Sequence, residues 1–502
     1  METETDVADT LKKPVAKTVQ AYIDETPFWE DGTAVDTMMM TGVQWRIWWL
    51  AAAGKFFEGM VVFMSGVALP LIAREFDIGA AGHGLVGASV LFGILIGASL
   101  LGGLADLFGR RRMFIVEMVL FILFLLLVTV SNGFPMLLIA MFGLGVALGC
   151  DYPTAHLVIS ESISSKARGR MVLGAFAFQA VGALVGTGLA YAVLSNFPTV
   201  EAWRYMYGAA ILPAAIVLFG RFFIPESPHW LATRGRNDMA KSALRFLLSR
   251  EPVYPSDFDL KTGDGDGGGA GDHGMGSQFK AIARLFVDKK TRRATILASV
   301  PWFLQDLGTY GIGIFTPVIL ASILGHQAAH ETSLSTVVHN DLLAAKGAAI
   351  IDVLLIVGIV FAVLLADRVG RIRLQIAGFI GCAVGLALAA ASTHAGPGFE
   401  VPLIFAGFML FNFMTNMGPN AQTYLLAGEV FPTECRAVGA GFAASFAKIG
   451  AVMTAFLFPV LLSDIGQDAL LMGLIITSLL GAAVTFAFRI ETKGVSLEDV
   501  AN

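Results

Sequence analysis

A series of apolar stretches of similar length recurs along this chain from about residue 47 to residue 489. Each is close to the roughly 20 residues that an α-helix needs to cross about 30 Å of hydrocarbon. Only helices and closed β-barrels satisfy their backbone hydrogen bonds within lipid, and these stretches are too long and continuous for barrel strands. We therefore predict an all-α membrane protein with twelve transmembrane helices, with these approximate bounds: 47–73, 86–106, 113–131, 135–158, 170–194, 205–224, 294–324, 347–366, 374–393, 402–427, 438–463 and 468–489.

The composition excludes several other classes of protein. Hydrophobic residues make up 56% of the chain and charged residues 15%, against about 25% charged in soluble domains. This argues against a disordered chain and an ordinary cytosolic enzyme. The three cysteines are too few and too scattered for a disulfide framework or a metal site. No nucleophile–base pair, HExxH spacing or basic patch is apparent, so we expect no enzymatic activity, cofactor, metal or nucleic-acid partner.

The placement of Lys and Arg predicts the orientation in the membrane. Basic residues follow the second, fourth, eighth, tenth and twelfth spans, and the alternate loops are poor in them: Arg110, Arg111, Arg112, Lys166, Arg168, Arg170, Arg368, Arg371, Arg373, Arg436 and Lys493. Because such loops stay in the cytoplasm, we expect both termini there, in an inner or plasma membrane. A linker containing GDGDGGGAGDHGMG (263–276) separates the spans into two groups of six.

The two groups of spans repeat the same polar motifs in the same order. Asp106, Gly109, Arg110 and Arg111 have counterparts in Asp367, Gly370 and Arg371, and Glu161 precedes Arg168 by seven residues as Glu429 precedes Arg436. The offsets (106 to 367, 161 to 429, 226 to 491) stay nearly constant. We therefore predict two pseudo-symmetric six-helix bundles. The expected division is a cytoplasmic tail (1–44), a first bundle (45–224), a cytoplasmic linker (225–293), a second bundle (294–489) and a C-terminal tail (490–502).

Polar side chains inside the spans are candidates for function, because they are costly in lipid. Trp302, Asp306 and Tyr310 are spaced i, i+4, i+8 and so share one helical face. Asp151 interrupts an apolar run, where burial favours the neutral, protonated carboxyl; a structural role bonded to a neighbouring helix is the alternative. Gln179 suits either helix–helix contact or ligand contact.

The tenth and eleventh spans add further polar groups. Asn412, Thr415, Asn416 and Asn420 surround a helix-breaking Gly418-Pro419 pair. Broken helices with amide side chains suit a polar substrate. Lys448 needs a carboxylate, a carbonyl or an anionic substrate as its partner.

The sequence motifs GGLADLFGRRR, ADRVGRIR, PESP and ETKG resemble the loop motifs of the major facilitator superfamily, over almost the whole chain from about residue 45. The resemblance implies a secondary transporter whose two bundles rock about a central site. It implies gating or conformational roles for the repeated loop residues: Asp106, Gly109, Arg110, Arg111, Glu161, Arg168, Asp367, Gly370, Arg371, Glu429 and Arg436. Asp106 can latch one state by accepting from a helix N-terminus or a neighbouring Arg.

A narrower resemblance points to the phosphate:proton symporters of that superfamily. GCDYPTAHLVISE, WFLQDLGTYG and the segment from FNFMTNMGPN to FAKIGA are similar to their motifs in spans four, seven and ten to eleven. The likeness implies that phosphate is bound by Tyr152, Gln179, Trp302, Asp306, Tyr310, Asn416, Asn420 and Lys448. It also implies proton coupling through Glu58, Asp151 and Asp306.

Three departures from that family leave the substrate open. Glu58 matches the first acid of the DxxD pattern typical of span one in this family, but Val61 replaces the second. Cys150 replaces a glycine, and His156 is unusual within a span. Expected partners are the bilayer, protons and a small anionic substrate, with the protein a monomer. The alternatives are transport of an organic acid, sugar or polyol, and a non-transporting sensor on the same fold.

Overall fold

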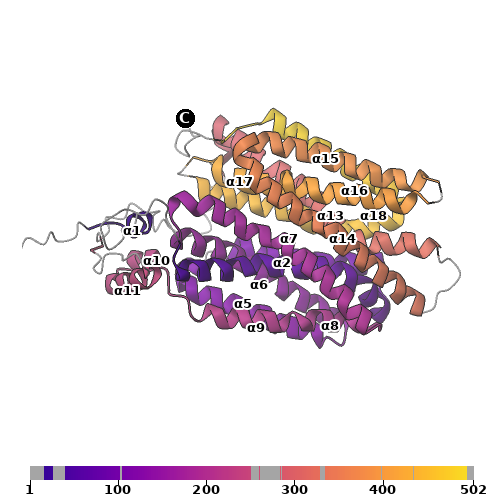
Figure 1. Ribbon diagram of the computed structural model, residues 1–502, viewed down its shortest axis with the longest axis horizontal. Coiled ribbons are helices and arrows are strands. Elements are labelled where there is room, and N and C mark those ends of the chain that lie inside the picture. The colour runs from indigo at the N-terminus through magenta and orange to yellow at the C-terminus, as the bar shows by residue number, and fades with distance from the viewer. Residues whose placement is uncertain are drawn as a thin grey trace, which may run out of the picture.

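The computed structural model describes residues 16–25, 40–101, 104–249, 259–260, 283, 285–327, 334–396, 398–432 and 435–493. Almost all of these residues are helical, and two groups of long helices lie side by side (Figure 1). The glycine-rich segment 263–276 and most of both predicted tails lie outside the described residues.

The first group contains the six predicted spans of the N-terminal half. Its helices are α2 (Gly42–Phe76), α3 (Ala80–Ile96) with the π-helical turn Gly97–Leu101, α4 (Leu104–Phe108), α5 (Arg110–Thr129), α6 (Phe134–Ser162), α7 (Ser165–Asn196), α8 (Ala202–Ala209) and α9 (Ile211–Arg221). Helices α8 and α9 together form the sixth span. The first helix begins at Gly42, inside the predicted tail, because Thr41 and Gln44 form a capping box there.

The second group contains the spans of the C-terminal half: α13 (Lys289–Gln327), α14 (Leu334–Val369), α15 (Arg371–Ala391), α16 (Glu400–Met417), α17 (Pro419–Glu429) and α18 (Arg436–Ala487). The tenth span is broken at Gly418 into α16 and α17, as the sequence predicts. Helix α18 contains 52 residues, and an uninterrupted helix of that length would measure about 78 Å, far more than the bilayer core. Gly466, with φ 79°, divides it into two spans.

Eleven helices of the described residues are long and apolar enough to cross a membrane. Since the last contains two spans, the predicted total of twelve is confirmed.

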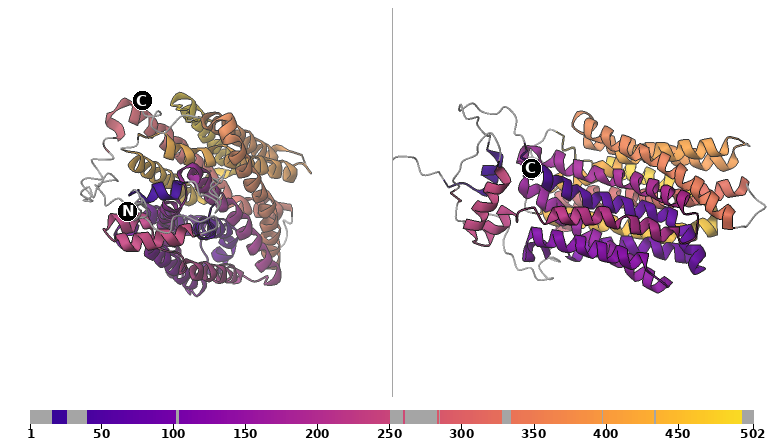
Figure 2. Two further views of the ribbon diagram at one scale, coloured as in Figure 1. Left: turned by 60° about the vertical axis from the view of Figure 1, so that its left-hand side comes forward. Right: turned by 60° about the horizontal axis from the view of Figure 1, so that its bottom comes forward.

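The two halves repeat one scheme of helix packing. In the first half α2 packs against α7 and α3 against α6; in the second, α13 packs against α18 and α14 against α16. The halves meet through α3 with α18, α7 with α14, and α2 with α13. Figure 2 shows the two halves from further directions.

One end of the molecule carries additional short helices, and we call it the linker end. Helices α1 (Val19–Asp24), α10 (Pro228–Thr233) and α11 (Asn237–Leu248) lie there together (Figures 1 and 2). Asp24 ties α1 to the start of α7, since its carboxylate accepts from the backbone N–H of Ser165 at 2.7 Å and from its hydroxyl at 2.8 Å. The opposite end is the far end.

The two halves touch closely towards the far end. A Cβ atom added to Gly66 of α2 would collide with the backbone oxygen of Ile314, and one added to Gly84 would collide with that of Phe456. Only glycine allows two backbones to approach so closely. The two halves are therefore in direct backbone contact towards the far end.

Candidate substrate cavity

A cavity lies between the two halves, lined by residues from α2, α3, α6, α7, α13, α17 and α18. Eight of the predicted site residues line it: Glu58, Tyr152, Gln179, Trp302, Asp306, Tyr310, Asn420 and Lys448. Lys55, Phe176 and Ser445 also contribute to the wall. The structure thus brings together side chains that are up to 390 residues apart in the chain (58 to 448).

Helix α13 presents its polar stripe to the cavity. Trp302, Asp306 and Tyr310 are all buried and all line the wall, as the i, i+4, i+8 spacing predicts. The stripe places an indole N–H, a carboxylate and a phenol along one side of the cavity.

Lys448 lies at the centre of the charged groups. Its ammonium is 2.5 Å from the Tyr310 hydroxyl, 3.6 Å from Glu58 and 3.7 Å from Asp306. It also lies 4.4 Å from the centre of the Tyr310 ring. One cation therefore faces two carboxylates from opposite halves of the protein.

A second lysine lies beside Glu58. The ammonium of Lys55 is 2.5 Å from Glu58 Oε2, and it stacks over the Tyr152 ring at 4.0 Å. The other oxygen of Glu58 accepts from Tyr310 at 3.2 Å and from Gln179 at 3.4 Å. Glu58 thus has four polar partners, whereas buried Asp306 Oδ2 has no hydrogen bond and only the more distant Lys448.

Amide side chains from the broken tenth span extend the cavity towards α14. Asn420 donates to Asn416 at 2.6 Å and accepts from Gln305 at 3.2 Å. Asn416 is held by the backbone oxygen of Leu355 and lines a neighbouring pocket with Gln179 rather than the central cavity. Of the two asparagines predicted to contact substrate, Asn420 is the one that reaches the central cavity.

Tyr424 of α17 covers the cavity on its linker side. Its ring stacks on Phe176 with centres 4.5 Å apart, and it meets Tyr152 and Trp302 edge-on at 6.2 Å each. Since Phe176 and Tyr152 belong to the first half, this aromatic cluster joins the two halves.

Asp151 lies outside the central cavity. It forms an ion pair at 2.6 Å with Arg221, which is fully buried and stacks on Phe114 at 3.5 Å. Asp151 instead lines a pocket nearer the linker end, with Lys55, Glu58 and His156. The pairing with Arg221 is the kind of contact that the structural alternative describes, and the proton-coupling role of Asp151 stays a prediction.

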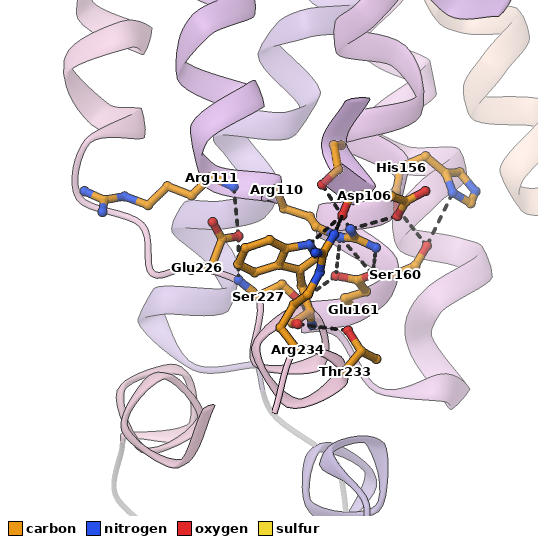
Figure 3. Close-up of polar contacts among 12 residues, drawn as sticks. Asp106, Arg110, Arg111, His156, Ser160, Glu161, Glu226, Ser227, Thr233 and Arg234 are labelled. Atoms are coloured by element: carbon orange, nitrogen blue, oxygen red, sulfur yellow. Dashed lines mark hydrogen bonds and ion pairs between the residues drawn. The ribbon is translucent and has the colours of Figure 1, made fainter. Parts of the chain in front are cut away.

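The repeated loop motifs form matching networks at the linker end. In the first half, Arg110 pairs with Asp106 at 2.8 Å and with Glu161 at 2.9 Å (Figure 3). Glu226 accepts from the backbone N–H of Arg111 at 3.0 Å, and Ser227 donates to Glu161 at 2.5 Å.

The second half repeats this network contact by contact. Arg371 pairs with Asp367 at 2.8 Å and with Glu429 at 3.2 Å. Glu491 accepts from the backbone N–H of Ile372, the counterpart of Arg111, at 3.3 Å and from that of Arg371 at 3.0 Å. Thr492 donates to Glu429 at 2.5 Å.

The glycines of the two networks are also equivalent. Gly109 and Gly370 each have φ 103°, and a Cβ on either would lie against Glu226 or Glu491. Glycine is needed at both positions because other residues rarely adopt this backbone conformation.

These contacts differ in one respect from the predicted latch, in which Asp106 bonds across the half-bundle. Each contact lies within its own half, and Asp106 pairs with Arg110 of its own loop. Glu161 and Glu429 pair with Arg110 and Arg371, whereas the side chain of Arg436 bonds the Phe431 carbonyl and no contact joins Arg168 to Glu161.

Sequence reasoning missed three buried ionisable residues, Glu117, Arg221 and Asp352, and the partly buried Lys55. Each lies within or at the end of an apolar stretch, so the rule that selected Asp151 applied to them as well. Glu117 accepts from Thr154 at 2.7 Å, close to the Asp151–Arg221 pair.

The sequence matches known transporters over nearly its whole length. Residues 47–502 match the family described as "Sugar (and other) transporter". The chain is 28% identical over 472 residues to the putative metabolite transport protein YaaU of Escherichia coli, covering 93% of this chain and 96% of that one. It is 26% identical over 445 residues to the inorganic phosphate transporter PHO84 of Saccharomyces cerevisiae, covering 80% and 73%.

The fold also matches a solved structure. The partially occluded inward-open form of the xylose transporter XylE from E. coli superposes with a TM-score of 0.70, covering 91% of this chain and all of that one, at 20% identity. These relatives are named as transporters rather than enzymes, and XylE is described as a major facilitator superfamily symporter. Together with its apolar helices, the family match makes this protein an integral membrane transporter. The chain belongs to the family described as "Sugar (and other) transporter".

Proposed function

We propose that this transporter carries a small anion together with protons by alternating access, and that inorganic phosphate is its first candidate substrate. The observation that carries the proposal is the set of charges in the cavity: Lys55 and Lys448 face Glu58 and Asp306, among the neutral donors Trp302, Tyr310 and Gln179. Dihydrogen phosphate needs several donors and an acceptor for its own O–H groups. This wall supplies both.

The charge balance explains why a proton would travel with the anion. With all four groups ionised, the two lysines and two carboxylates cancel. A proton on one carboxyl leaves a net charge of +1, which a monoanion neutralises. When the anion and a proton load together, the buried cavity stays neutral. A net charge is costly in a low-dielectric site, so the protonation of the carboxyl sets the affinity for the anion.

Asp306 is the better candidate for the transported proton. Glu58 is engaged by Lys55, Tyr310 and Gln179. Asp306 Oδ2 is buried without a hydrogen-bond partner, and Lys448 lies 3.7 Å away. A carboxyl with fewer partners loses less when it is neutralised. Release of this proton on the linker side would restore the negative charge and expel the anion.

The backbone contact towards the far end and the aromatic cluster that covers the cavity fit one stage of alternating access. We propose that the linker end faces the cytoplasm, as its basic loops indicate, and that the loop networks hold the helices of each half together as it rocks. Because these networks do not cross between halves, they would stiffen each half rather than lock the two together.

A neutral substrate is the second candidate. The four cavity charges already cancel, and Trp302, Gln179 and Asn420 would suit the hydroxyls of a sugar or polyol. The name of the family and the E. coli xylose transporter favour this reading, and PHO84 favours phosphate. An organic acid fits the same cations as phosphate.

Competition separates these candidates. Purified protein in proteoliposomes is given radiolabelled phosphate under an inward proton gradient, with unlabelled phosphate, xylose, a polyol or a dicarboxylate as competitor. Inhibition by phosphate alone supports the proposal. No uptake of labelled phosphate, with uptake of labelled xylose, polyol or dicarboxylate in its place, would replace phosphate with that class, and ligand binding without any uptake would favour a sensor.

A further inference from the structure

A buried carboxyl between the two halves has no part in the cavity chemistry. Asp352 of α14 is 4% exposed and lines none of the pockets described above. Its Oδ2 lies 3.1 Å from the hydroxyl of Thr187 on α7, and its Oδ1 accepts from Asn412 of α16 at 3.2 Å. Thr187 belongs to the first half, so this contact joins the two halves.

The contact lies on the far side of the cavity. Thr187 is eight residues beyond Gln179 along α7, and Asn412 is eight residues before Asn420 in the tenth span, which runs towards the linker end. Eight helical residues correspond to about 12 Å. Both helices therefore place Asp352 about 12 Å beyond the cavity, at a depth similar to that of Gly66, which is eight residues beyond Glu58 on α2 and approaches the backbone of Ile314.

No cation offsets a charge on Asp352. Its interacting groups in the described part of the chain are Thr187 and Asn412, both neutral. Most titratable residues in the interior of the helices packed against α14 line or cover the cavity or bond elsewhere: Lys55, Glu58, Asp306, Tyr310, Cys382 and Tyr424. Tyr191 of α7 lies one helical turn beyond Thr187 and carries no positive charge. Asp341 and exposed Lys346 lie on α14 itself. An ionised carboxylate buried in this way is costly.

The geometry suits a neutral carboxylic acid. The Thr187 hydroxyl has one proton, and the backbone oxygen of Ala183 lies 3.1 Å from it. Thr187 can therefore donate to Ala183 and accept from a protonated Asp352 Oδ2. Asn412 then donates to Oδ1, and each polar atom of the group has a partner.

We propose that Asp352 is a second proton-binding site, separate from the cavity, and that the far end closes only when this site holds its proton. The inference rests on the alternating access proposed above. When the halves separate at the far end, Asp352 meets water and ionises; when they close, it must be neutral again. This proton is bound and released on the far side and differs from the one that crosses with the substrate.

Spin-label distances across the far end test the proposal. Labels at Ser195→Cys on α7 and Leu343→Cys on α14 occupy exposed or half-exposed ends of two helices from opposite halves. The protein is placed in nanodiscs with Cys435 replaced by Ser and without substrate. Distances are measured from about pH 5.5 to about pH 8.5, a range in which exposed carboxyls stay ionised and carboxyls whose pKa is raised by burial titrate.

The wild-type distances should lengthen as the pH rises. Asp352→Asn keeps the shape and stays neutral, so its distances should remain short across the range. Glu201→Gln is the matched control: it neutralises an exposed carboxyl just before α8, outside the cavity, and should keep the shift. A shift that persists in Asp352→Asn, or its absence in the wild type, would overturn the proposal.

A second variant, Thr187→Val, tests the proposal if Asp352→Asn does not fold. Thr187→Val removes the acceptor for the protonated carboxyl, so closure should need more acidic solution, with the midpoint lower by about one pH unit, the equivalent of one hydrogen bond. An unchanged midpoint contradicts the role of this contact. Because the distances need no substrate, their outcome is independent of the uptake assays that test phosphate and proton coupling.

Discussion

Removing the cation from the Asp151–Arg221 pair should destabilise the first half severely. Arg221 is fully buried, 2.6 Å from Asp151, and no other cation contacts that carboxylate in the described residues. Breaking a buried ion pair by removing one partner typically costs about 3–5 kcal/mol, because the other charge remains buried. We expect Arg221→Met to lower the free energy of unfolding by that amount.

The opposite change should cost less. In Asp151→Asn, Arg221 keeps the backbone oxygens of Phe114 at 2.6 Å and Leu50 at 3.3 Å, and the Phe114 ring beneath it. The double variant Asp151→Asn/Arg221→Met removes both members of the pair, leaves Glu117 as a buried carboxyl beside it, and should recover about 2 kcal/mol of the Arg221→Met loss.

Unfolding in SDS, followed by tryptophan fluorescence, measures these differences in purified protein. Arg204→Met is the matched control, because the Arg204–Glu75 pair is partly exposed and should contribute no more than about 1 kcal/mol. Losses for Asp151→Asn and Arg221→Met that simply add in the double variant would refute the reasoning. So would an Arg221→Met variant as stable as the control.

Three further changes test other parts of the account. Lys448→Met leaves two carboxylates facing the substrate and should reduce phosphate uptake more than tenfold without loss of folding; uptake near the wild-type rate would contradict the role of this cation. Gly370→Ala should lower stability by about 1–3 kcal/mol, because φ is 103° and the new Cβ would lie 2.6 Å from Glu491 Oε2. Its control is Gly428→Ala, where the helix has open space around the new Cβ, and this change should be neutral or stabilising. Tyr424→Ala removes the aromatic cover and should speed substrate exchange in counterflow severalfold; an unchanged rate would show that the cover does not limit access.

The sequence predicted the parts of the site that depend on one helix. The spacing of Trp302, Asp306 and Tyr310 fixes a common face, and that face lines the cavity. The break at Gly418-Pro419 follows from the chemistry of proline. The predicted number of spans is correct even where α18 contains two of them, because the thickness of the bilayer sets the length of a span.

Pairings between helices could not be predicted in this way. Asp151 and Arg221 are 70 residues apart on the fourth and sixth spans, and no periodicity indicates that they meet. The same holds for Asp352 and Thr187, which lie in different halves. Lys55 was predictable as a charge within a span, and its spacing of three residues from Glu58 predicts that the two side chains pair. The spacing does not predict that both line one cavity with residues of the other half.

Uptake of radiolabelled phosphate into proteoliposomes tests the central claim most directly. With wild-type protein, an inward proton gradient should stimulate uptake, and unlabelled phosphate should abolish it. Asp306→Asn should remove the stimulation, while Asp151→Asn, changed outside the cavity, should keep it in protein that folds. Uptake indifferent to the gradient, or full stimulation in Asp306→Asn, would contradict the account.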